Sequence, residues 1–342
     1  MDRIKRTRIQ LDLLRDHKEQ HLIGDHCTHL ALKNSNSYMI CTMKKGLKLI
    51  ESGIQLYQGL LPIPNAWLKD AIYIEHKNCY LFDYNSKIYI KDVNELPPYE
   101  FMNLNSGYRI GSCLLYSEYC KRLFVAKDWK GIAMVNIDSK SVEVEMKNAY
   151  DDYMEDIKLF GAKKSKVVSF SKDGCIVGFG FDPEARKATV LFKQRVKLDP
   201  KTSEKACSVE ICPHGRFVFV EVEKGNLKEK EKRCVSRYVI YEIDEKKLKK
   251  MKSLTFENKE VCRHLALASA YVGPDLVIIG LTSEASSVVQ AIHYCVRDAT
   301  LVELEDKTMQ AGEGYPVKLI NFDGDCFYTG FNGRFMRLRL QF

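Results

Sequence analysis

Four histidines and one cysteine lie close together near the N-terminus. The segment DHKEQHLIGDHCTH contains His17, His21, His26 and His29, with Cys27 between the last two. Imidazole and thiolate groups are the usual zinc ligands, and the spacing of the first two histidines would place both rings on one face of a helix. Structural zinc sites, however, present paired cysteines or a Cys2His2 spacing, which this segment lacks. We therefore predict no metal and no cofactor, and interpret the segment as a polar loop.

The remaining cysteines do not form an arrangement that is typical of nucleophilic catalysis. Several of the twelve lie inside apolar, strand-like runs, at Cys41, Cys79, Cys113, Cys175 and Cys295. A reactive thiol needs a histidine or a cation beside it, and none of these has an evident partner of that kind in the sequence. The chain also contains no glycine-rich phosphate loop, no Gly-x-Ser-x-Gly turn and no kinase signature. We predict that the protein is not an enzyme and that its cysteines are free thiols in a reducing compartment.

The composition describes an ordinary packed chain. With 45% hydrophobic and 29% charged residues, the sequence excludes disordered and collagen-like proteins. No apolar run approaches the roughly 18 residues that cross a bilayer, and the start, MDRIKRTRIQ, has no apolar segment of a signal peptide. We expect a protein that is neither inserted in a membrane nor secreted, located in the cytoplasm or, alternatively, in the nucleus.

An internal repeat supplies the elements that must position any functional residue. Seven segments share one pattern, in which an apolar, β-branched or aromatic run, a polar turn and a second such run predict a hairpin. Equivalent positions recur on average about every 48 residues, close to the period of a propeller blade. They are Tyr38, Tyr80, Leu123, Ile176, Val218, Val277 and Phe327.

Most hairpins are preceded by another strand-like stretch, such as THLALKNSN or KVVSFSKDG, and several are followed by a more polar strand, such as SVEVEMK or TLVELED. Four strands per unit and seven units predict an all-β, seven-bladed β-propeller that forms a single domain over residues 1–342. Blade 4 is the weakest unit, because only RVKLDP is available as its outer strand, so six and eight blades remain alternatives. The predicted blades span residues 27–64, 65–105, 106–150, 151–200, 201–258, 259–311 and 312–342.

The two ends of the chain predict how the ring closes. The last unit ends at Phe342 after three strands, so its outer strand is missing. Near the N-terminus, Ile9, Leu11 and Leu13 alternate with polar residues at the period of two that marks a half-buried strand. We predict that residues 6–14 form the fourth strand of the last blade and so remove its open edge. A disordered basic N-terminus is the alternative.

On these repeats, the chain resembles the WD-repeat-like β-propeller family over essentially its whole length. The resemblance is architectural, because no unit ends in Trp-Asp and no unit opens with Gly-His; Asp128-Trp129 has the pair reversed and lies in a turn. The family's Asp-His-Ser-Trp hydrogen-bond tetrad therefore cannot be placed on any blade. The resemblance implies a scaffold that presents rims of loops to its partners.

One rim is the candidate site for binding a partner. In the hairpin interpretation, the turns between the second and third strands all project from the same rim, which is basic and carries Trp129 at a hairpin tip. An exposed aromatic beside cations is typical of an interface hot spot, although this tryptophan can also fold back over its own blade. The predicted partner-binding residues are Lys44, Lys45, Trp129, Lys130, Arg186, Lys187, Lys228, Lys230, Lys232, Arg233 and Phe331.

Charge suggests two further surfaces. Residues 224–252 hold eleven Lys or Arg and five Asp or Glu, in a chain of formal net charge +8. This stretch is either a solvated loop or a basic surface for nucleic acid, anionic lipid or an acidic protein. Acidic residues crowd a predicted loop between blades 3 and 4, which is either solvated or a docking site for a basic partner. They are Asp151, Asp152, Glu155 and Asp156.

These features predict a non-catalytic protein-interaction scaffold within a larger, multi-subunit intracellular assembly. The alternative is a nucleic-acid or ribonucleoprotein component that uses the basic loops. A third hypothesis is an enzyme on a propeller scaffold, with its active site in loops between blades.

The lysine-rich run at residues 224–233 is expected to be dispensable for folding, because Leu227 is its one apolar anchor. Replacing the run with a two-residue Asn-Gly turn should change the free energy of unfolding by less than about 1 kcal/mol, measured by chemical denaturation. A Gly/Ser run of unchanged length is the control. Failure of the shortened chain to fold would show that the run is structural.

Overall fold

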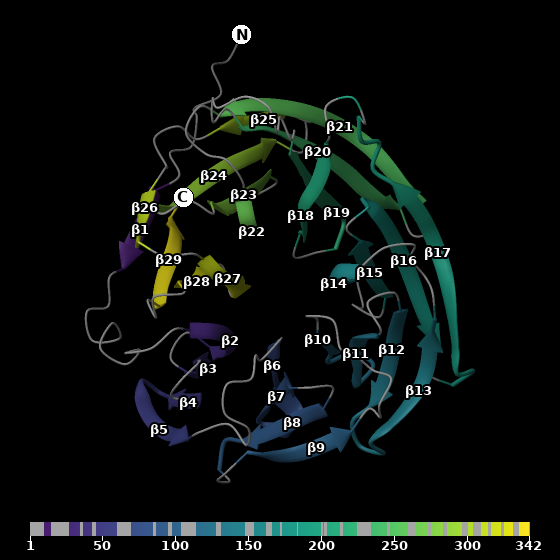
Figure 1. The fold of residues 1–342 in the computed structure, drawn as a ribbon, viewed down its shortest axis with the longest axis vertical. Helices are drawn as coiled ribbons and strands as arrows, with labels where there is room; N and C mark the ends of the chain where they lie inside the picture. The colour runs from purple at the N-terminus through teal and green to yellow at the C-terminus, as the bar shows by residue number, and fades with distance from the viewer. Residues whose placement is uncertain are drawn as a thin grey trace.

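The strands of this chain form antiparallel sheets that follow one another around a central axis, as a β-propeller does (Figure 1). The computed structural model describes residues 10–14, 27–34, 37–42, 46–59, 70–84, 87–94, 98–103, 114–127, 131–147, 154–161, 166–171, 173–182, 184–199, 201, 204–212, 215–223, 234–244, 247–258, 264–272, 275–282, 286–295, 300–303, 309–313, 316–322, 325–330 and 335–341. The described strands group into seven sheets, which we number as blades 1 to 7 in chain order. The predicted all-β propeller class is confirmed.

Blades 1 to 3 each contain four strands that pair in chain order. Blade 1 consists of β2 (Cys27–Asn34), β3 (Ser37–Thr42), β4 (Gly46–Glu51) and β5 (Ile54–Gly59). Blade 2 consists of β6 (Ala71–Ile74), β7 (Cys79–Tyr84), β8 (Lys87–Asp92) and β9 (Tyr99–Asn103), with the short 3-10 helix η2 (Glu75–Lys77) between its first two strands. Blade 3 consists of β10 (Leu114–Ser117), β11 (Arg122–Lys127), β12 (Gly131–Asn136) and β13 (Ser141–Met146).

Blades 4 to 6 continue the ring. Blade 4 consists of β14 (Met154–Phe160), β15 (Lys166–Ser171), β16 (Cys175–Asp182) and β17 (Lys187–Arg195). Blade 5 consists of β18 (Lys205–Ile211), β19 (Phe217–Glu223), β20 (Cys234–Asp244) and β21 (Lys247–Asn258). In blade 6, the strands β25 (Thr300–Glu303) and β26 (Met309–Glu313) pair with different parts of β24 (Ser286–Cys295), beyond β22 (His264–Val272) and β23 (Asp275–Thr282).

The N-terminal strand closes the ring. Blade 7 contains β27 (Pro316–Phe322), β28 (Asp325–Gly330) and β29 (Phe335–Gln341), and its outer strand is β1 (Gln10–Leu14). The pairing is antiparallel, with Leu11 opposite Leu340 and Leu13 opposite Leu338. The predicted closure is confirmed, and it joins the first described strand of the chain to the last.

The core lies between neighbouring blades, because the middle strands are buried on both faces. Alternate residues of β7 point in opposite directions, as in any strand. Tyr80 and Phe82 pack with residues of blade 1, while Cys79 and Leu81 pack with residues of blade 3. The consecutive apolar runs of the sequence are therefore strands sandwiched between two blades.

The predicted strand order of blade 4 is wrong. KVVSFS was expected to be the first strand and RVKLDP the outer one, but the structure places β14 ahead of them, over part of the expected acidic loop. The buried residues of β14 are Met154, Ile157 and Phe160. A β-bulge between Met154 and Asp156 interrupts the period-two alternation, so the segment does not look like a strand in the sequence. The hairpin at residues 175–195 is thus formed by the third and fourth strands.

Removing β1 should destabilise the whole ring. Deleting residues 1–15 takes away the pairing partner of β29 and exposes a sheet edge, so we expect the melting temperature to fall by at least about 5 °C. Deleting residues 1–8 leaves β1 in place and serves as the control, with little expected change. Equal melting temperatures for the two truncated chains would contradict the closure.

Candidate interaction surfaces

The two rims of the propeller follow from strand order. Turns after the first and third strands of each blade lie on one rim, here called rim A, and turns between the second and third strands lie on the other, rim B. Arg186 and Lys187 lie between the third and fourth strands of blade 4, and therefore on rim A. The prediction that they share rim B with the other basic turns is wrong, because it rested on a wrong strand order for blade 4.

Most other residues singled out in the sequence lie outside the described part of the chain. These are Lys44, Lys45, Trp129, Lys130, Lys228, Lys230, Lys232, Arg233 and Phe331 of the predicted rim, together with His17, His21, His26, Asp151 and Asp152.

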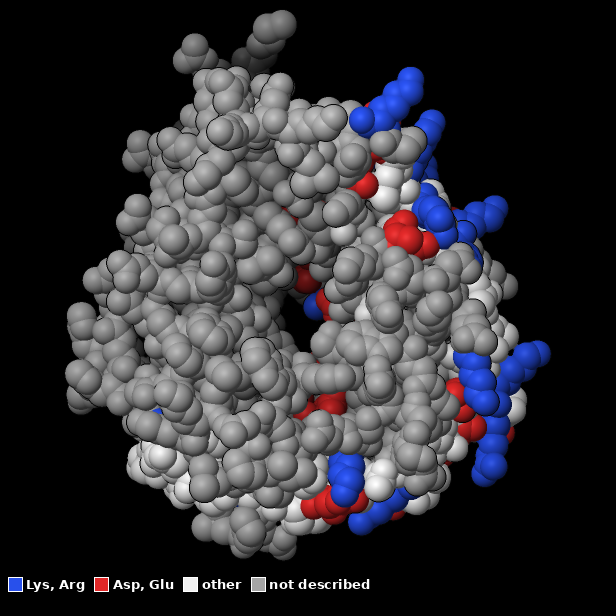
Figure 2. Space-filling view, in the orientation of Figure 1, with Lys and Arg blue, Asp and Glu red and all other residues white. Residues whose placement is uncertain are grey.

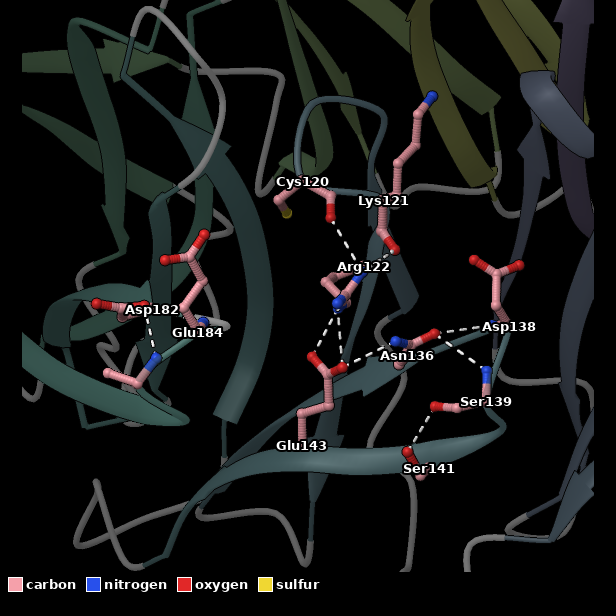
Figure 3. A network of polar contacts seen from close by, with 11 residues as sticks. Cys120, Lys121, Arg122, Asn136, Asp138, Ser139, Ser141, Glu143, Asp182 and Glu184 are labelled. Atoms are coloured by element: carbon pink, nitrogen blue, oxygen red, sulfur yellow. Dashed lines mark hydrogen bonds and ion pairs between the residues drawn. The ribbon is translucent and has the colours of Figure 1, made fainter.

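A bidentate ion pair organises rim A in blade 3 (Figure 3). Arg122, at the start of β11, donates from Nε and Nη2 to the two carboxylate oxygens of Glu143 on β13, over 2.6 and 3.0 Å. Asn136 donates to the same carboxylate over 2.8 Å. The remaining guanidinium nitrogen donates to the carbonyls of Cys120 and Lys121. The pair thus ties three strands and the turn before β11 into one network.

The surroundings of Glu143 lower the pKa of its carboxyl group. Burial opposes ionisation, but hydrogen bonds from Arg122 and Asn136 and the nearby charge of Arg186 outweigh it, so the pKa lies below its ordinary value. The influence of Arg186 on a carboxylate of blade 3 agrees with its place on rim A. Charged residues of blades 3 and 4 therefore interact at this rim.

The turns that end the third strands of blades 3 and 4 are built alike. Asn136 Oδ1 accepts hydrogen bonds from the backbone N–H groups of Asp138 and Ser139, and Asp182 Oδ1 accepts from those of Glu184 and Ala185. A short side-chain acceptor at this position caps a tight turn. The equivalent turn in blade 4 supports its corrected strand order (Figure 3).

Paired charges also join blades 2 and 3 at rim A. Lys77 of η2 lies 2.6 Å from Asp138, and His76 Nδ1 lies 3.3 Å from Glu118 Oε2. Lys121 makes a second ion pair with Glu118, over 2.7 Å. Within this network Tyr119 is 59% exposed. Rim A of these blades therefore carries ion pairs within blade 3 and between blades 2 and 3.

Positive charge gathers on the outer circumference of blades 4 and 5. The outermost strands β17 and β21 are neighbours there (Figure 1), and Figure 2 shows Lys and Arg side chains projecting from this side. We call the exposed cations of these strands and the segment after β17 the basic belt. Its members are Lys187, Lys193, Arg195, Lys197, Lys201, Lys247, Lys249 and Lys250.

Few acidic groups offset the basic belt. Arg195 forms an ion pair with Asp173 over 2.5 Å, and the exposed Asp199 and Asp244 lie at the ends of the two segments. The sequence pointed to the lysines of residues 247–252, but it did not predict the contribution of β17. β17 contributes because it is the outermost strand of blade 4.

The described residues contain no cluster that could hold a metal ion. Within them, no group of three or more His, Cys, Asp or Glu side chains could hold a metal ion, and no helix is long and apolar enough to cross a membrane. Disulfide bonds do not involve the described cysteines Cys41, Cys79, Cys120, Cys175 and Cys212. Burial raises the pKa of Cys79 to about 12, so this thiol stays protonated at neutral pH.

The comparisons with known proteins support the fold alone. No protein-family model matches the sequence, and no curated protein matches it. A solved structure, that of a protein from Lactobacillus plantarum, is similar with a TM-score of 0.64 and 10% identity. The match covers 84% of this chain and 86% of that one, so the likeness extends over nearly the whole ring. In all, 1237 chains of solved structures match, and a fold so widely shared does not select a function.

Rim A should respond to acid. The pKa values of Glu118, Asp138 and Glu143 lie below their ordinary values, so their stabilising effect is present at neutral pH and is lost as the pH falls through 4.5 and below. Glu143→Gln should lower the free energy of unfolding by about 1 kcal/mol at pH 7 and flatten its decline between about pH 5 and 3. Urea denaturation at several pH values measures both.

Glu145→Gln, two residues further along β13, is the matched control and should retain the acid-dependent decline. If Glu143→Gln declined with acid as steeply as the unmodified chain, the ion pair with Arg122 would carry no pH-dependent stability.

Proposed function

We propose that this protein is a non-catalytic interaction scaffold of the WD-repeat-like kind, which works in a multi-subunit assembly of the cytoplasm or nucleus and binds an acidic partner protein through the basic belt. The observation that supports this function is the segregation of exposed cations on two neighbouring outer strands. The strands of a propeller fix the backbone positions from which these cations extend. The backbone therefore loses little conformational entropy when the belt meets a partner.

Protection of sheet edges is the simplest other explanation of lysines on outer strands. It does not account for their distribution, because the outer strands of other blades carry different charges. β13 presents Glu143 and Glu145, and β5 presents no charge at all. A positive surface that, among the residues of known exposure, lies on blades 4 and 5 favours an electrostatic partner, since such a surface steers association and excludes basic competitors.

Nucleic acid is the second candidate partner. The observation that favours it is the close spacing of Lys247, Lys249 and Lys250 along β21. A row of cations along an extended strand can follow a phosphate backbone. The two candidates differ in how binding depends on salt and on the chemistry of the ligand.

Charge reversal on the basic belt should weaken binding of an acidic probe. The double variant Lys193→Glu/Lys249→Glu should bind a 20-residue poly-glutamate peptide at least about tenfold more weakly than the unmodified chain, measured by fluorescence anisotropy, since each reversal replaces attraction by repulsion. Lys121→Glu/Lys140→Glu on rim A changes the net charge equally and is the matched control. Equal weakening by both variants would show a nonspecific effect of net charge and contradict the basic belt as the site.

An RNA oligonucleotide of 20 nucleotides separates the two candidates. If RNA binds more tightly than poly-glutamate and loses affinity steeply and linearly on a logarithmic salt scale, the nucleic-acid candidate replaces the protein partner. In cell extracts, a protein partner that uses the basic belt should be captured by the unmodified chain and the rim A control, and lost with the belt variant.

A further inference from the structure

The start of β17 carries a sequence of the kind that basic-selective protein kinases recognise. The run is Arg186, Lys187, Ala188 and Thr189, so two cations precede a hydroxyl by three and two residues. Kinases that select basic substrates bind such cations through acidic side chains beside the active site. No other Ser or Thr of the chain has Arg at the first of these positions together with Lys or Arg at the second. The sequence therefore singles out Thr189 as the acceptor.

The hydroxyl of this acceptor is accessible. Arg186, Lys187 and Thr189 are all exposed. β17 is the outermost strand of blade 4 (Figure 1), and among the described strands it pairs with β16 alone. Thr189 Oγ1 donates to the carbonyl oxygen of Gly180 over 3.4 Å, which is long for a hydrogen bond. Breaking this bond therefore costs little when the hydroxyl enters an active site.

The first residues of β17 are weakly held by the rest of the blade. None of residues 187–190 is buried, and Phe192 is the first buried side chain of the strand. A β-bulge between Val190 and Phe192 interrupts the pairing with β16. Thr189 lies opposite Gly180, which has no side chain to pack against it. The segment before the bulge can therefore open locally and lie extended in a kinase cleft while the ring stays folded.

The side chain of Thr189 faces the seam between blades 4 and 5. The position at which a side chain of Gly180 would begin lies 3.4 Å from Thr189 Oγ1 and 3.3 Å from the side chain of Leu191. Thr189 and Leu191 are therefore on the same face of β17. Leu191 packs against the core shared by blades 4 and 5, so this face is the one toward blade 5.

Lys250 of β21 faces the same seam from the other side. It lies opposite Tyr241 of β20, which is buried in the core shared by blades 4 and 5. Cross-strand partners lie on one face of a sheet, so Lys250 points toward blade 4. β17 and β21 both follow a turn after the third strand of their blade and so begin at rim A. Thr189 and Lys250 therefore lie near the same end of the basic belt.

We propose that Thr189 is a phosphorylation site for a serine/threonine kinase that selects basic substrates, and that its modification switches off the basic belt. The kinase transfers the γ-phosphoryl group of ATP to Thr189 Oγ1. A bond from phosphorus to this oxygen forms, the bond from phosphorus to the oxygen of the β-phosphate breaks, and ADP leaves. The hydroxyl proton passes to an aspartate of the kinase.

The phosphate changes the charge at the centre of the belt. Phosphothreonine carries about −1.5 to −2 charge at pH 7. It lies two residues, or about 7 Å, along the strand from Lys187, and it faces Lys250 across the seam. The phosphate therefore attracts two cations of the belt and repels an acidic partner. The switch rests on the proposed function of the basic belt, whereas the modification site does not.

Phosphate incorporation from radiolabelled ATP tests the site. The folded full chain, treated with the catalytic subunit of protein kinase A, should take up about one phosphate per molecule. Thr189→Ala should lower the uptake by at least about tenfold, and Thr189→Ser should retain it. Arg186→Gln should lower kcat/KM for phosphorylation by at least about tenfold, because it removes a cation that the kinase binds.

Ser236→Ala is the matched control for the uptake. Ser236 has Arg233 three residues before it but Cys234 two residues before it, so its removal should leave the uptake unchanged. Uptake that Thr189→Ala retains, or that occurs only after the chain is denatured, overturns the proposal.

Binding of the 20-residue poly-glutamate peptide tests the switch. The chain phosphorylated at Thr189 should bind the peptide at least about tenfold more weakly than the unmodified chain, measured by fluorescence anisotropy. Thr189→Glu should weaken binding in part. Ser139→Glu adds the same charge at an exposed position of rim A and is the control, which should bind like the unmodified chain.

Equal binding by the phosphorylated and unmodified chains overturns the switch. If neither form binds poly-glutamate, the basic belt is not a site for an acidic partner and the switch falls with it, while phosphorylation of the folded chain at Thr189 still establishes the modification site. If the unmodified chain binds poly-glutamate but Thr189 takes up no phosphate, the proposed function stands and this inference is overturned.

Discussion

Packing between blades is the constraint on which the rest of this structure depends. The middle strands of blades 2 to 4 bury both faces, one against the preceding blade and one against the following blade. In β16, for example, Val177 and Phe179 pack toward blade 3, while Ile176 packs toward blade 5. No blade is stable alone, because half of its apolar surface belongs to an interface with a neighbour. The ring must close, and the pairing of β1 with β29 closes it.

The same constraint decides where polar residues can lie. A polar group between blades must be matched, as in Asp70, whose carboxylate accepts hydrogen bonds from the backbone N–H groups of Ala71 in its own blade and Leu114 in the next, both over 2.8 Å. At rim A, where water is near, Arg122 and Glu143 perform a comparable role with full charges. These groups use their hydrogen bonds to hold blades and turns together.

The outermost strands are under fewer packing constraints than the middle strands. Adjacent blades diverge away from the axis, so the outermost strand of each blade has neighbours on fewer sides and its side chains are free of the packing rules that govern the middle strands. β17 and β21 carry cations there, and β5 carries Ile54 and Leu56. Each of these edges differs from the others in charge and polarity, so a ring of nearly repeating blades has chemically distinct outer strands around its circumference.

The sequence by itself determined the class of fold, the hairpins and the closing strand, because alternation and turn chemistry are local properties of a strand. Only the tertiary structure decided the order of strands in blade 4. The bulge after Met154 breaks the alternation of β14, so its pairing with β15 is evident only in the folded sheet. Because the sequence does not show β14 to be a strand, it assigns Arg186 to the wrong rim and does not assign Lys193 to an outer strand. Rim and edge depend on a strand's position counted from the axis, which no local pattern encodes.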